Sequence, residues 1–249
     1  MAKKKTWLGR AVGVLLVLVL ATSCFVGGTF AKYTTSGSGS DSARVAKFGV
    51  NVTADSGKMF STTYAKDADN SFTVTGDTVV SQNEDKLVAP GTKGQMANFN
   101  ITGTPEVAVR VQFKVDEFKL ENWTIDDAGT VYCPIRINVN GIKIRLNPAG
   151  HTAADLAAFE NEVKSTINGI KCDIAPGTDI AQELAKPNPD NNGNIYNLNI
   201  SWEWPFESGN DAVTNLEYDA KDTKLGDAAA NGTPGKITLK ITATVTQIN

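Results

Sequence analysis

Two long segments of the chain alternate between apolar and polar residues, which is the pattern of a β-strand with one buried face. In residues 106–115 the apolar positions are Val107, Val109, Val111, Phe113 and Val115. In residues 236–248 they are Ile237, Leu239, Ile241, Ala243 and Val245. Because successive side chains of a strand point to opposite faces of a sheet, both segments require a sheet with one covered face and one exposed face.

Shorter segments with the same alternation lie between turn signals in much of the remaining chain. The clearest of these predicted strands are residues 95–102, 132–139 and 195–204. The dipeptide Asn140-Gly141 predicts a tight hairpin turn that leads into a further strand at residues 142–146. Many antiparallel strands are therefore expected along the whole chain.

One segment has helical spacing instead. Thr152 is placed to cap the N-terminus of this helix, and Asn168-Gly169 is placed to end it. Its apolar residues recur every three or four positions, at Leu156, Phe159, Val163 and Ile167. Such a stripe most simply packs on a sheet. The expected fold class is all-β: a single antiparallel β-sandwich or jelly roll with one inserted helix, preceded by an N-terminal signal helix.

The first 31 residues have the features of a secretory signal peptide. Four basic residues, Lys3, Lys4, Lys5 and Arg10, precede an uncharged apolar run at residues 11–20. Small residues at Thr29 and Ala31 then predict cleavage between Ala31 and Lys32. The mature protein is expected to be secreted and extracellular. It would contact a membrane only through the signal segment before cleavage.

Two other fates of the signal segment stay open. Residues 21–24 resemble a lipoprotein box, although Ala21 stands where a larger aliphatic residue is usual, so Cys24 is an alternative site of lipidation. No charged residue lies between Arg10 and Lys32, so an uncleaved segment is long enough to span a bilayer as an anchor. We divide the chain into a signal peptide at 1–31, a flexible Gly/Ser-rich leader at 32–42 and one domain at 43–249.

The charge of the chain narrows the class of partner. The precursor has 24 basic and 27 acidic residues, a net charge of −3. Because the signal peptide holds four basic residues and no acidic one, the mature chain keeps 20 basic residues against 27 acidic ones, a net charge of −7. This acidic balance, without a basic cluster in the mature sequence, argues against nucleic acid and anionic membranes as partners.

The two cysteines of the mature chain, Cys133 and Cys172, are candidates for a disulfide because the protein is expected outside the cell. Sequence alone does not establish that they meet, so both the paired and the free state stay open. Metal binding is not indicated, because there is no CxxC motif and His151 is the only histidine.

The sequence also lacks a recognisable set of catalytic or cofactor-binding residues. It contains no HExxH, no phosphate-binding loop and no GxGxxG, and any Ser-His-Asp triad would have to use His151. The acidic segments 67–69, 126–127 and 219–222 lack EF-hand spacing, and we interpret them as solvated turns. We therefore expect a protein that is not an enzyme and that holds no cofactor or metal.

A third alternating segment, residues 43–52, directly follows the flexible leader. Its apolar residues Ala46, Phe48, Val50 and Val52 are expected to share one face of a half-buried strand. A strand on a flexible tether has two uses. It can close the sheet of its own domain, or it can pair with the exposed edge of a neighbouring subunit.

Four stretches, spread in order over nearly the whole chain, carry a family resemblance. They are GGTFA at 27–31 before a Tyr/Thr/Ser leader; SARVAKFGV at 42–50; VAPGTKG at 88–94 with PEVAVRV at 105–111; and ISWEWPFE at 200–207, followed by DTKLG at 222–226 and the terminal strand. With these stretches the chain resembles the TasA/camelysin family of exported Gram-positive proteins, which a SipW-type signal peptidase processes.

The resemblance implies a jelly-roll domain outside the cell that self-associates into fibres, because the N-terminal strand of one subunit inserts into a groove of the next. The donor face would be Ala46, Phe48, Val50 and Val52. The proteolysis suggested by the camelysin name is not carried over, since no metal-binding set is recognisable. The leading hypothesis is thus an extracellular structural protein of the cell surface or biofilm matrix that assembles through its N-terminal strand.

The alternative hypothesis is a monomeric secreted or cell-surface binding module for a glycan or a host protein. Such a module would need exposed aromatic residues, for which Trp123, Trp202 and Trp204 are the candidates. Trp202 and Trp204 share a strand face with Ile200, so we expect them in the core instead.

Overall fold

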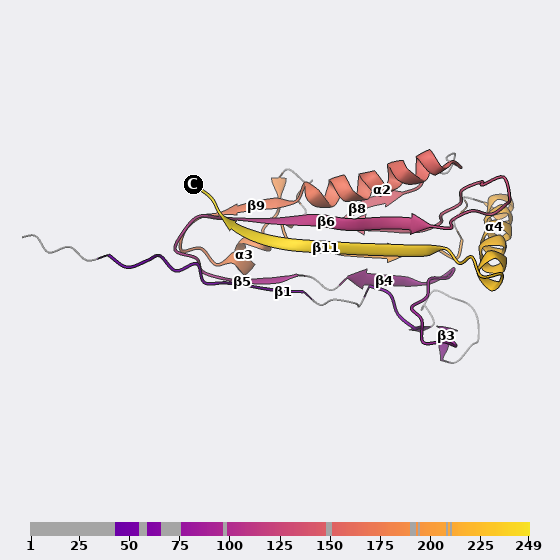
Figure 1. Cartoon of the computed structure of the whole chain (residues 1–249), viewed down its shortest axis with the longest axis horizontal. Coiled ribbons are helices and arrows are strands. Elements are labelled where there is room, and N and C mark those ends of the chain that lie inside the picture. The colour runs from indigo at the N-terminus through magenta and orange to yellow at the C-terminus, as the bar shows by residue number, and fades with distance from the viewer. Residues whose placement is uncertain are drawn as a thin grey trace, which may run out of the picture. The chain divides into compact units, whose positions relative to one another are not determined.

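The computed structural model describes residues 43–54, 59–65, 76–96, 99–147, 151–189, 193, 195–207, 209 and 211–249. The expectations for the signal peptide, for Cys24, for cleavage between Ala31 and Lys32, for the leader and for the acidic segment 67–69 lie outside the described residues. Residues 46–249 form one compact unit. Its described part is mainly β, with antiparallel strands in several sheets and few helices (Figure 1), so the expected all-β class is confirmed in its coarser form, a mainly-β fold.

Two larger sheets organise the domain. The first has the order β4-β10-β7-β8, and its strands are β4 (Lys93–Met96), β10 (Ile200–Glu203), β7 (Arg136–Val139) and β8 (Ile142–Arg145). The second has the order β11-β6-β9, and its strands are β11 (Lys236–Gln247), β6 (Val109–Glu121) and β9 (Lys171–Ile174). Apart from the hairpin of β7 and β8, hydrogen-bonded neighbours in both sheets come from distant parts of the sequence.

Two smaller ladders complete the described strands. One joins β1 (Val50–Thr53) to β5 (Asn100–Gly103), and the other joins β2 (Thr63–Ala65) to β3 (Asp77–Val80). The prediction of one strand over residues 95–102 is therefore wrong, because this stretch contributes to β4 and to β5 in two different sheets. A change of sheet leaves no mark on the polar and apolar alternation, which explains the error.

The two long alternating segments become the neighbouring strands β6 and β11. They are paired from Lys236 opposite Glu121 to Gln247 opposite Val109, with a shift of register between Lys240 and Ile241 (Figure 1). The even alternation of β6 is interrupted in the same region, where Val115 and Phe118 are both buried. The prediction of two long strands is confirmed, and their pairing is the most extensive ladder in the described residues.

A single core collects side chains from both larger sheets. The inward residues of β6 include Val109, Val111 and Phe113, which are between 0 and 2% exposed. The four-stranded sheet contributes a second set, namely Ile137, Ile144, Ile200 and Trp202. Trp123, Trp202 and Trp204 are 2%, 2% and 5% exposed, so the prediction that the last two lie in the core is confirmed.

The predicted helix is α2 (Ala153–Asn168), and its N-terminus is capped as expected. Thr152 accepts a hydrogen bond from the Asp155 N–H, and the Asp155 carboxylate accepts one from the Thr152 N–H, which completes a capping box. Its buried residues are Phe159, Val163 and Ile167. Helix α2 also anchors β6, because Glu160 accepts a hydrogen bond from the Leu120 N–H at 2.7 Å.

The expectation of only one helix is wrong. The structure also has α3 (Ile180–Leu184) and the 19-residue α4 (Ala212–Ala230). The interpretation of residues 219–222 as a solvated turn fails with it, because these residues lie inside α4. Helix α4 buries only Leu225, so its sequence has no broad apolar stripe that would have revealed it. Within the described part of the chain, no helix has the length and apolar character needed to cross a membrane.

Candidate functional site

The N-terminal strand β1 is held to its own domain by a short ladder. It pairs with β5 from Val50 opposite Gly103 to Thr53 opposite Asn100. Just before β1, the Lys47 carbonyl accepts a hydrogen bond from the Glu106 N–H at 2.9 Å, and the Lys47 N–H donates to the Glu106 carboxylate at 2.8 Å. Among the described residues no third strand joins this ladder, so β1 and β5 each have one unpaired edge.

The apolar residues of this segment are less buried than predicted. Ala46 is exposed, Phe48 is 42% exposed and Val52 is 39% exposed. Only Val50 is partly buried against the core. The prediction of one buried face over Ala46, Phe48, Val50 and Val52 is therefore wrong for the single chain.

A glycine explains why the alternation fails. Gly49 has φ +53°, a left-handed conformation that interrupts the pleat between Phe48 and Val50, so the strand begins only at Val50. Across the ladder, a Cβ on Gly103 would lie 2.2 Å from the Gly49 carbonyl oxygen. The close approach of β1 to β5 at this end thus requires that Gly103 has no side chain.

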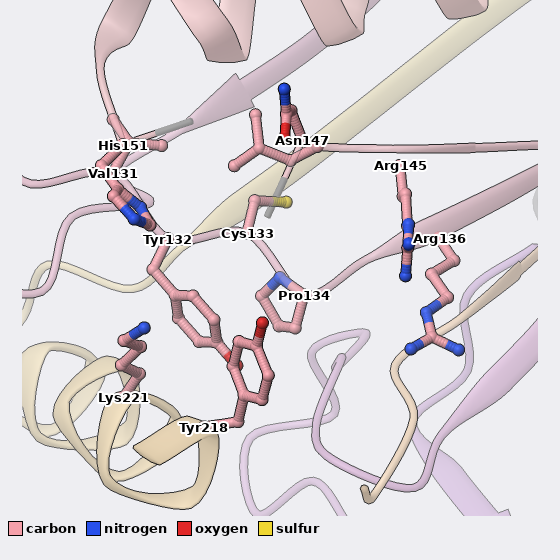
Figure 2. Close-up of a pocket in the computed structure, with 11 residues that line it drawn as sticks. Val131, Tyr132, Cys133, Pro134, Arg136, Arg145, Asn147, His151, Tyr218 and Lys221 are labelled. Carbon is pink, nitrogen blue, oxygen red and sulfur yellow. The ribbon is translucent and has the colours of Figure 1, made fainter. Parts of the chain in front are cut away.

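A second notable cluster lies where α4 meets the domain. The Asp222 carboxylate accepts a hydrogen bond from the Tyr132 hydroxyl at 2.8 Å and one from the Trp204 indole N–H at 3.3 Å. The Tyr132 ring stacks on Tyr218, with centroids 6.0 Å apart. Figure 2 shows Lys221 beside these two rings, and its ammonium lies 5.7 Å and 5.1 Å from their centroids. These polar and aromatic contacts, together with Leu225, hold α4 against the domain.

The electrostatics of this cluster follow from burial. Desolvation raises the pKa of Asp222 to about 6, against the opposing effect of its two hydrogen-bond donors. Burial also raises the pKa of Tyr132, and the nearby Asp222 charge adds to that shift. The tyrosine therefore stays protonated, as its role of hydrogen-bond donor requires. A perturbed carboxyl of this kind marks either a functional group or a structural clamp.

The space around the cluster helps to separate these two roles. The pocket of Figure 2, lined by Tyr132, Cys133 and Tyr218 among others, has a volume of about 50 Å³, too small for a substrate of ordinary size. Asp222 itself borders a larger hollow of about 670 Å³, which also has Trp123, Trp204 and Leu225 in its walls. Since the Asp222 carboxylate already accepts hydrogen bonds from Tyr132 and Trp204, we interpret it as part of a structural clamp that holds α4 in place.

The two cysteines are free thiols in this structure, and both are buried. Cys172 lies in β9 opposite Val111 of the three-stranded sheet, whereas Cys133 precedes β7 of the four-stranded sheet. The disulfide between Cys133 and Cys172 that the sequence allowed is thus not formed here. Burial raises the pKa of Cys133 to about 12 and that of Cys172 to about 11, which makes both poor nucleophiles.

His151 is exposed at the edge of the pocket in Figure 2, and its carbonyl accepts a hydrogen bond from the Val131 N–H. Within the ranges that the structure describes, no three His, Cys, Asp or Glu side chains are grouped to hold a metal ion. The segment at 126–127 is a turn, in which the Asp126 carboxylate accepts a hydrogen bond from the Thr130 N–H at 2.9 Å.

Comparison of the chain with protein-family models, with curated proteins and with solved structures finds no match in any of the three.

Proposed function

We propose that this chain is an exported structural protein whose N-terminal strand joins copies into fibres at the cell surface or in an extracellular matrix. The function is non-catalytic, and the subunits are each other's partners. A SipW-type signal peptidase is the partner during export. The domain is a jelly roll, a proposal supported by its antiparallel pairings and by non-sequential neighbours such as β10 between β4 and β7.

The observation that carries the proposal is the weak attachment of β1. This strand has only four paired residues, and three of the four are exposed. Phe48 and Val52 leave apolar surface in water, which a second protein surface would cover. A strand that is short, terminal and poorly buried costs little to detach from its own domain.

Exchange of β1 between copies would preserve every bond that it makes within one chain. If β1 of one copy takes the place beside β5 of the next, the same ladder forms, and Phe48 gains a new surface to cover it. Such an exchange is a domain swap, and a head-to-tail swap that does not close into a ring produces an open filament. Backbone bonds provide the affinity, while alternate side chains set the register.

A disulfide between β1 and β5 tests this assembly. Asn51 and Thr102 lie opposite each other in the ladder, so the variant N51C/T102C places two cysteines within bonding range. Oxidation of dilute monomers would lock β1 on its own domain. We expect oxidised monomers that form no fibres in electron micrographs and reduced samples that do.

The same variant, oxidised after fibres have grown, should give covalent multimers on a denaturing gel, because each disulfide then joins two copies. The single variants N51C and T102C are the matched controls and should form fibres without such multimers. If oxidised N51C/T102C monomers still formed fibres, strand exchange would be excluded as the mechanism of assembly. Absence of fibres from unmodified mature protein under all conditions would exclude the structural role.

A further inference from the structure

The outward face of the four-stranded sheet gathers cations in two rows. The register of the strands places Lys93, Glu203, Arg136 and Arg145 side by side in the first row. The second row holds Gln95, Ser201, Asn138 and Lys143. We call these eight residues the cationic face. It has four basic residues and one acidic residue, a net charge of +3, although the mature sequence carries −7.

The first row breaks a rule of sheet stability. Arg136 and Arg145 are directly opposite in β7 and β8, and like charges in that position destabilise a ladder. Figure 2 shows the two side chains next to each other. Glu203 relieves only part of the repulsion, with one oxygen 3.5 Å from Arg136. An unfavourable arrangement of this kind is typical of a functional site.

The outward face of the other large sheet is the natural contrast. There, four basic residues have carboxylate partners, in the pairs Arg110–Asp173, Lys114–Asp116, Lys119–Glu121 and Lys240–Glu117. On the cationic face, Lys143 and Arg145 have no carboxylate partner among the residues described by the structure. The strands of that sheet also hold Lys171 and Lys236, so its outward face is positive as well, with six basic residues against four acidic ones. The feature that distinguishes the cationic face is the direct opposition of two arginines, with Glu203 beside only one of them.

The shape and the neutral residues of the cationic face indicate the kind of anion. A hollow of about 430 Å³ is lined by seven of these eight residues, all except Arg145, and Gln95, Asn138 and Ser201 supply amide and hydroxyl groups to it. Arginine binds carboxylates with two parallel hydrogen bonds, and amides and hydroxyls bind sugar hydroxyls. Stacking of nucleic acid bases would need exposed aromatic rings, whereas Trp202 beside the hollow is only 2% exposed.

We propose that the cationic face binds an acidic polysaccharide, with sugar carboxylates on its basic residues and sugar hydroxyls on its neutral polar residues. The fit rests on the opposite charge of ligand and face and on the mixture of cations with hydroxyl-binding groups. The face includes no residue of β1 or β5, so the inference does not depend on fibre assembly.

The test is binding of polygalacturonate to mature protein, measured by isothermal titration calorimetry at low and moderate salt. The variant K143Q/R145Q removes the two cations that lack a carboxylate partner. We expect it to bind at least about tenfold more weakly than the unmodified protein. The control K119Q/K240Q removes the same charge from the other sheet, and it should bind within about twofold of the unmodified protein. Neutral dextran should not bind.

Three results would overturn the proposal. Unmodified protein that does not bind polygalacturonate would exclude the site, and equal weakening by the two double variants would reduce it to non-specific charge attraction. If the protein bound double-stranded DNA more tightly than polygalacturonate, the ligand of the cationic face would not be an acidic polysaccharide. Urea unfolding of each variant shows whether a loss of binding reflects a loss of folding. If K143Q/R145Q is unstable, the single variant K143Q is compared with the single variant K240Q instead, because Lys143 lines the hollow.

Discussion

Replacement of Asp222 by asparagine should remove a pH dependence of stability that the buried carboxyl creates. Asp222 has a pKa of about 6 in the folded protein, whereas an aspartate in an unfolded chain has a pKa of about 3.9. Between these two values the folded state binds more protons than the unfolded state. The free energy of unfolding contributed by Asp222 therefore falls as the pH rises from about 4 to about 6, and it is level above that window.

The size of the effect follows from the difference between the two pKa values. One pH unit corresponds to about 1.4 kcal/mol, so a gap of about two units sets an upper limit near 3 kcal/mol. Asp222 is only partly buried, and solvent screening lowers the expected change to about 1 to 2 kcal/mol. Asparagine keeps an acceptor for the Tyr132 hydroxyl but does not titrate, so its variant lacks this contribution.

Urea unfolding of mature protein and of D222N, at pH values from 4 to 8, measures the effect. The other carboxyls with a shifted pKa, such as Asp155 and Asp173, have it lowered, and they contribute equally to both proteins. The difference in stability between the two proteins therefore isolates Asp222. The variant D227N changes an exposed residue of the same helix and serves as the charge control. A difference that stays constant from pH 4 to pH 8 would refute the assignment of Asp222 as a buried acid.

Two further predictions concern the core. Because Cys133 and Cys172 are buried free thiols, a thiol reagent should label neither of them in the folded mature protein and both of them after denaturation. Rapid labelling of the folded protein would contradict their burial. The second prediction concerns Gly94, where a Cβ would lie 2.2 Å from the Met59 carbonyl oxygen. That oxygen accepts the hydrogen bond of the Trp202 indole N–H. The variant G94A should therefore lower the free energy of unfolding by about 2 to 4 kcal/mol. The control G226A has open space in α4 and should leave stability unchanged or raise it slightly.

The sequence predicted best those elements whose partners are local. The hairpin at Asn140-Gly141 joins β7 to β8, and both turn residues have positive φ values of 48° and 86°, as the dipeptide indicates. Helix α2 has its predicted cap and its predicted buried residues, because both depend only on spacing within one segment. Strand pairing between distant segments cannot be obtained in this way. Alternation shows which face of a strand is buried but not which strand lies beside it.

Helix α4 was missed because its contacts are mainly polar and aromatic. Only Leu225 is fully buried, and the helix is held by Asp222 and by the stacking of Tyr218 on Tyr132. Two signals in the sequence were available. Asp211 and Thr214 have the spacing of a capping box, and Tyr218, Asp222 and Leu225 recur at helical intervals. Neither signal is strong without a broad apolar stripe to accompany it.

The cationic face was also beyond sequence reasoning, although all of its residues were visible. Its two rows bring together β4, β7, β8 and β10, whose residue numbers extend from 93 to 203. The sequence contains no basic cluster beyond its first ten residues, which led to the expectation that nucleic acid and anionic membranes are not partners. The sheet creates the cluster by placing separate basic residues in adjacent strands.

Fibre assembly and polysaccharide binding together have a consequence that neither has alone. Copies joined through β1 would each present one cationic face, so a fibre offers a long acidic polymer many equivalent sites. Binding at several sites at once raises the apparent affinity without any new contact. Fibres of reduced N51C/T102C should therefore bind polygalacturonate at least about tenfold more tightly, per subunit, than its oxidised monomers.

A short galacturonate oligomer that covers a single face provides the control for this comparison. It should bind fibres and locked monomers with equal affinity, because each contact involves one subunit in both cases. Equal affinity for the long polymer as well would show that successive faces of the fibre are not aligned along one polysaccharide chain. Weaker binding of the short oligomer to fibres would show that assembly covers the cationic face, and the face would then belong to the subunit interface.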